Sequence, residues 1–65
     1  MQHSIVWKQG RVVVERETTT LAKLSEVIAS AESQISRVQK NHPGRELDCF
    51  DVYDAIGRLV AIKKI

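Results

Sequence analysis

Two β-type runs around a short glycine-containing segment open the sequence and set its architecture. Residues 5–14 read IVWKQGRVVV, in which both apolar runs consist of β-branched or aromatic residues. Such runs on either side of a short segment with a glycine are typical of a β-hairpin, because glycine supplies the positive φ that tight turns need. We expect a hairpin over residues 4–15, with Gln9-Gly10 as the turn and Val6 opposite Val13.

The period of the apolar residues then changes from that of a strand to that of a helix. Apolar side chains recur at alternating spacings of three and four, namely Leu21, Leu24, Ile28, Ala31, Ile35 and Val38. This spacing is typical of the buried stripe of an amphipathic helix. We expect one long helix over residues 19–40, with the threonines at 18–20 as its N-cap region and the segment 41–44, NHPG, as its stop.

The last third of the chain predicts a second hairpin, over residues 46–65. Two strand-like runs flank Asp54-Ala55-Ile56-Gly57, which suits a type I turn with Asp first and Gly fourth. In the simplest register, Leu59 and Ala61 share one face with Cys49 and Tyr53. The predicted fold is a single small α+β domain over residues 1–65, in the order ββαββ, with the helix packed on an antiparallel four-stranded sheet.

The small size and the apolar strands together favour a partner. The chain has 65 residues and one cysteine, so no internal disulfide can form. Domains of this size bury only about 60% of the surface that their unfolded chains expose. One helix covers one face of the sheet, whereas the predicted strands are apolar on both faces. We therefore expect a homodimer or a complex with another protein, with five contact residues: Val6, Val13, Tyr53, Leu59 and Ala61.

The sequence offers little that resembles catalytic or cofactor chemistry. Its obvious nucleophile, base or soft-ligand candidates are His3, His42 and Cys49, and three glycines provide no phosphate-binding loop. Asp48, Asp51 and Asp54 recur every third residue, which on a strand places neighbours on opposite faces. We therefore expect a non-enzymatic protein without metal or cofactor. The lack of a long apolar run or a signal-like start, together with the lone cysteine, favours the cytosol.

Basic residues near the predicted hairpin tips provide an alternative function. Lys8 and Arg11 flank the first turn, Arg58 follows the second, and Arg45 precedes the second hairpin. Doubled in a dimer, these side chains would contact nucleic-acid phosphates with salt-sensitive affinity. Residues 10–14 and 51–60 also resemble the two hairpins of the swapped-hairpin transition-state regulators and antitoxins. That resemblance implies a dimeric DNA-binding regulator in which interleaved hairpins carry basic side chains to the duplex.

The leading hypothesis from the sequence is a protein-interaction or regulatory module that works as a homodimer. Small chains of this kind, without catalytic residues, are often accessory proteins of phages or other mobile elements that bind and modulate a larger protein. This step rests on analogy of size and architecture rather than on a chemical signature. The DNA-binding regulator remains the alternative.

Overall fold

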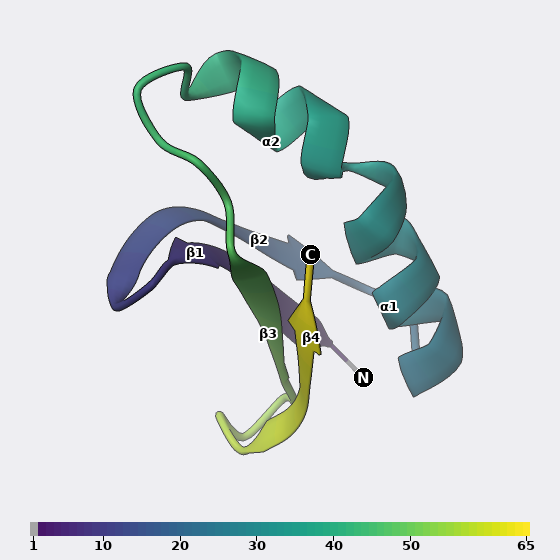
Figure 1. Cartoon of the computed structure of the whole chain (residues 1–65). Coiled ribbons are helices and arrows are strands. Elements are labelled where there is room, and N and C mark those ends of the chain that lie inside the picture. The colour runs from purple at the N-terminus through teal and green to yellow at the C-terminus, as the bar shows by residue number, and fades with distance from the viewer. Residues whose placement is uncertain (1) are drawn as a thin grey trace.

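The computed structural model describes residues 2–65 as a small α+β fold in the order ββααββ. The strands are β1 (His3–Gln9), β2 (Val12–Thr19), β3 (Cys49–Tyr53) and β4 (Leu59–Lys64), and the helices are α1 (Leu24–Ser33) and α2 (Ile35–Asn41) (Figure 1). The strands form one antiparallel sheet in the order β2-β1-β3-β4. The expected α+β class and the four-stranded antiparallel sheet are confirmed.

The helical segment differs from the prediction of one long helix. Strand β2 continues to Thr19, the first helix begins only at Leu24, and the helix breaks at Gln34, whose φ and ψ are −98° and −3°. Serines explain the break, because a serine hydroxyl competes with the backbone for hydrogen bonds. Ser33 Oγ donates to the carbonyl of Ser30, and Gln34 Nε2 donates to Ser30 Oγ. Apolar periodicity passes unchanged through such a break, which is why the pattern predicted a continuous helix.

The core lies between the helices and the two central strands. Alternate residues of β1 and β3 meet the apolar stripe of the helices, and the fully or almost fully buried set is Ile5, Trp7, Val27, Ala31, Val38, Leu47, Phe50 and Val52. Trp7 contributes the largest side chain, and its Nε1 donates a hydrogen bond of 3.4 Å to the Ala31 carbonyl. Burying one large apolar side chain contributes about 1.5–3 kcal/mol. This cluster therefore holds the helices on one face of the sheet.

The register of the first hairpin differs from the expected one. The turn is Gly10-Arg11, with Gly10 at a φ of 58°, as in two-residue turns that have glycine first. Val13 pairs with Lys8, and Val6 pairs with Arg16. A bulge between the pairs Lys8–Val13 and Trp7–Glu15 adds Val14 to β2. The position of the turn thus places Val13 opposite Lys8 instead of Val6, and the extra residue places Arg16 opposite Val6.

The second hairpin also contains one residue more than a regular register allows. Its turn forms at residues 54–57, where Gly57 has a φ of 84° and donates a hydrogen bond of 3.0 Å to the Asp54 carbonyl. Tyr53 pairs with Leu59, but Val52 pairs with Ala61, so Val60 is the extra residue of a bulge. Ala61 therefore lies on the helix-covered face, not on the face of Tyr53 as expected.

Candidate interaction surface

The face of the sheet opposite the helices, called the open face below, carries polar and apolar side chains in rows. Alternation along each strand and the register of pairing place three rows of four on this face. From β2 to β4 the rows are Thr18–Ser4–Tyr53–Leu59, Arg16–Val6–Asp51–Ile62 and Val13–Lys8–Cys49–Lys64. The expectation that this face is apolar is therefore wrong for its middle, where the second hairpin contributes Asp51.

The middle of the open face holds a satisfied polar cluster. The Asp51 side chain is almost fully buried, and its Oδ2 lies 3.2 Å from Lys8 Nζ and accepts a hydrogen bond of 3.3 Å from the Tyr53 hydroxyl. The hydrogen bond and the charge of Asp51 raise the pKa of Lys8, against a smaller opposing effect of desolvation. The neighbouring Val6 is only 3% exposed. This region is closed by its own side chains and offers little apolar area to a partner.

Exposed apolar side chains gather instead on the edge strand β4 and beside it. Residues 56–65 hold five of the eight exposed large apolar side chains in residues 2–65, namely Ile56, Leu59, Val60, Ile62 and Ile65. Ile62 is 60% exposed although it lies in the middle of its strand. Exposed apolar side chains gathered on one edge strand usually mark an interaction site.

The backbone of β4 has a free side as well. The Asp48 amide donates to Lys8 O, but Ile65 N donates to Asp48 O at 2.9 Å and, at the other end of the hairpin, Asp54 N donates to Arg58 O at 2.9 Å. The pairs Asp48–Ile65 and Asp54–Arg58 therefore each supply a hydrogen bond between the two chain segments of the hairpin. In an antiparallel ladder such pairs alternate with pairs whose amides and carbonyls point the other way. The amides and carbonyls of Ile62 and Lys64 therefore point away from β3, toward the open edge. An edge with unpaired groups is a template for adding another strand.

The structure separates the five residues predicted for the interface. Val6 is buried in the open face, Ala61 packs against the core on the helix side, and Tyr53 is half-buried. Val13 is 50% exposed but lies on β2, at the opposite edge of the sheet from Leu59. Sequence reasoning missed Ile62, because only the bulge at Val60 turns it to the open face. The signal available was that Ile62 directly precedes two lysines, Lys63 and Lys64.

The four basic residues of the alternative function are divided between two ends of the sheet. Lys8 and Arg11 lie at the first turn, and Arg45 joins them through a 3.4 Å hydrogen bond from its Nη1 to Gln9 Oε1. Arg58 follows the turn that joins β3 to β4, at the other end of β1. Lys64 is added to the first group, in the row of Lys8 and Cys49. Three of the four predicted residues are thus brought together, and one is not.

A second polar cluster joins β2 to α2 on the helix side. Glu15 accepts hydrogen bonds from Arg37 Nη2 at 2.9 Å and pairs with His42 Nε2 at 3.1 Å, and Arg37 also lies 3.6 Å from Glu17 Oε2. Burial opposes ionisation of Glu15, but the hydrogen bonds and charges of His42 and Arg37 outweigh it and lower its pKa. These contacts tie α2 and the residue after it to β2.

Within residues 2–65, no three His, Cys, Asp or Glu side chains are grouped so that they could hold a metal ion. In the same residues, neither helix has the length and apolar character needed to cross a membrane. Cys49 is half-buried and stands between Lys8 and Lys64 in its row. No protein-family model matches this chain, and neither the curated proteins nor the solved structures give a significant match.

Proposed function

We propose that this protein is a non-enzymatic interaction module that forms a homodimer by pairing the free edge of β4 with the β4 of a second copy. The observation that carries the proposal is the coincidence of two features on one strand. The edge has outward-pointing backbone groups at Ile62 and Lys64, and it also carries exposed apolar side chains at Leu59, Val60 and Ile62. Strand addition uses both features, since backbone hydrogen bonds hold the strands and side chains bury apolar area.

A second copy of the chain fits this edge because the strand is complementary to itself. A two-fold axis at Ile62 places this residue opposite Ile62 of the second copy. The outward amide of each Ile62 then donates a hydrogen bond to the outward carbonyl of the other. In that register Lys64 stands opposite Val60 of the second copy, and Lys63 stands opposite Ala61. Lysines on an edge strand oppose pairing with a second copy when they face each other, because like charges repel. In this register they do not face each other. The two sheets join into one continuous sheet.

The proposed role of the dimer is regulatory binding of a larger protein. The helices remain on one side of the continuous sheet, and the open faces of both copies, with Tyr53 and Arg16, remain on the other. This arrangement leaves a second, more polar surface for a heterologous partner after dimerisation. An accessory protein of a phage or other mobile element would act in this way, by occupying a host protein rather than by catalysis.

Sedimentation of three proteins tests the pairing. The unaltered chain should sediment at twice its mass of 7.3 kDa at tens of micromolar. Ile62→Lys should shift the population to the monomer, since two lysines would then face each other at the two-fold axis. Val13→Lys adds the same charge to the other edge strand and should leave the dimer intact. A monomeric unaltered chain, or equal effects of the two substitutions, would contradict the proposal.

DNA binding remains a second candidate because one end of the sheet is basic. Lys8, Arg11, Arg45 and Lys64 lie there, although Asp51 pairs with Lys8 and Asp48 Oδ2 accepts from Gly10 N at 2.7 Å. If this end contacts phosphates, affinity for random duplex should fall steeply with added salt. Arg11→Gln should weaken that binding, whereas Arg58→Gln at the other end of the sheet should not. Absence of duplex binding at low salt removes this candidate.

A further inference from the structure

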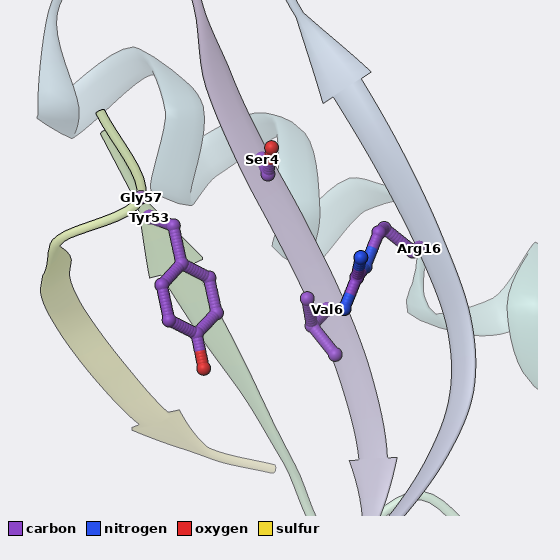
Figure 2. A pocket seen from close by; sticks show the side chains of 5 residues that line it. All are labelled: Ser4, Val6, Arg16, Tyr53 and Gly57. Atoms are coloured by element: carbon purple, nitrogen blue, oxygen red, sulfur yellow. The ribbon is translucent and has the colours of Figure 1, made fainter. Parts of the chain in front are cut away.

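A hollow on the open face lies between a guanidinium and an aromatic ring. Its volume is about 340 Å³, and its lining comes from Ser4, Val6, Arg16, Tyr53 and Gly57. Ser4 and Val6 form the floor on β1, while Arg16 from β2 and Tyr53 from β3 stand on either side (Figure 2). The walls thus belong to strands on opposite sides of β1, roughly 9–10 Å apart in the plane of the sheet. Short side chains between two long ones create the hollow.

Arg16 is the one charged residue among the five that line the hollow. Arg16 makes no ion pair with any acidic residue of the part of the chain that the structure describes. The acidic groups around it are occupied elsewhere. Asp51 is held by Lys8 and Tyr53, and Asp54 Oδ1 accepts from the amides of Ile56 and Arg58 at 3.1 and 2.8 Å. Glu15 and Glu17 lie on the other face, beside Arg37. The hollow therefore favours an anion, and a guanidinium binds a planar carboxylate through two parallel hydrogen bonds.

The other wall is aromatic and held in place. The Tyr53 hydroxyl donates to Asp51, which fixes the phenol ring beside the hollow. Its half-buried ring offers apolar contact next to the guanidinium, and the buried Val6 closes the floor of the hollow. At the end of the hollow, Gly57 has no side chain, and an added Cβ there would have no neighbour within 4 Å. This leaves room for a flat group to lie along the ring.

We propose that this hollow is a binding site for a carboxylate carried on a flat apolar group, such as an aromatic acid. Arg16 binds the carboxylate, and the Tyr53 ring contacts the flat group. The site lies on the face that remains accessible when β4 pairs with a second copy. It would give the protein a specificity for aromatic acids that its dimerisation does not require.

Backbone amide spectra recorded during titration test the site. Benzoate is the probe, and it should shift the amide signals of Ser4, Val6 and Gly57 with saturation in the millimolar range. Acetate carries the charge without the ring, and benzyl alcohol carries the ring without the charge. Both should bind at least several times more weakly than benzoate, since each loses one of the two walls. Equal shifts with acetate would mean that the ring is not recognised and would contradict the proposal.

Two variants assign the binding to Arg16. Arg16→Gln should weaken benzoate binding by about tenfold or more, because a charge-assisted contact is lost. Arg11→Gln removes the same charge from the other end of the sheet and should leave the affinity unchanged. Both arginines are exposed, so neither change should unfold the protein. The proposal is overturned if benzoate shifts no amide of the hollow, or if both variants weaken binding equally. Sedimentation of Arg16→Gln as a dimer separates this site from pairing through β4.

Discussion

At the scale of one residue, Glu15 shows how polar contacts supplement the small apolar core in joining the helices to the sheet. It lies on β2, opposite Trp7 of the apolar cluster, and its carboxylate accepts a hydrogen bond from Arg37 of α2 and pairs with His42, which follows α2. Because the ionised form makes these contacts, folding lowers the pKa of Glu15. A carboxyl group with a lowered pKa stabilises the fold above its ordinary pKa of 4.5, and this contribution is lost as the pH falls through the folded value.

Glu15→Gln should therefore reduce stability in a pH-dependent way. We expect the free energy of unfolding to fall by about 1 kcal/mol at neutral pH, since the partly exposed contacts of the carboxylate with Arg37 and His42 are weakened. The difference from the unaltered protein should shrink as the pH drops below the ordinary value. Urea denaturation at neutral and acid pH measures it. Glu32→Gln, at an exposed position of α1, is the control, and a similar pH dependence in that variant would argue against the role of Glu15.

The two turns show at the scale of elements what glycine does here. Gly10 and Gly57 both adopt positive φ, and non-glycine residues in residues 2–65 do not. For an L-residue the left-handed region costs roughly 1–2 kcal/mol. At Gly57 no neighbouring atom would meet an added Cβ, so the whole effect of a substitution comes from the backbone.

Gly57→Ala should lower the free energy of unfolding by about 1–2 kcal/mol. Gly44 provides a matched control, since it has no positive φ and also has open space around an added Cβ. Gly44→Ala should be neutral or slightly stabilising, because alanine restricts the unfolded chain. Thermal denaturation of both variants checks the difference. Equal melting temperatures for the two would show that the turn does not depend on left-handed geometry.

The elements were largely predictable, and their registers were not. Alternating and helical apolar periods indicated both hairpins and the helical stripe, because burial imposes the same periods on the sequence. The bulges at Val14 and Val60 left no mark, since one extra valine in a run of apolar residues does not alter the pattern. Each bulge turned the residues beyond it to the other face of the sheet. The bulge at Val60 thereby moved Ala61 to the core and Ile62 to the surface.

At the scale of the whole molecule, the strand order decides which residues are accessible. The order β2-β1-β3-β4 places the first and second hairpins side by side through β1 and β3, so Val13 and Leu59 lie on opposite edges. No local pattern predicts which strands become central. Apolar residues on both faces of the predicted strands therefore led to the prediction of a partner. That the exposed apolar side chains gather on β4 could be known only from the strand order of the assembled sheet.

Hydrogen exchange at the amides of Ile62 and Lys64 tests the central claim, pairing through β4, most directly. Both amides point to the free edge, and in a monomer water reaches them. We predict that they exchange slowly in concentrated protein and rapidly after dilution below the dimer's dissociation constant. The amides of Ala61 and Lys63, which point to β3, serve as the internal reference. Rapid exchange of Ile62 and Lys64 at every concentration, with Ala61 and Lys63 protected, would contradict the account.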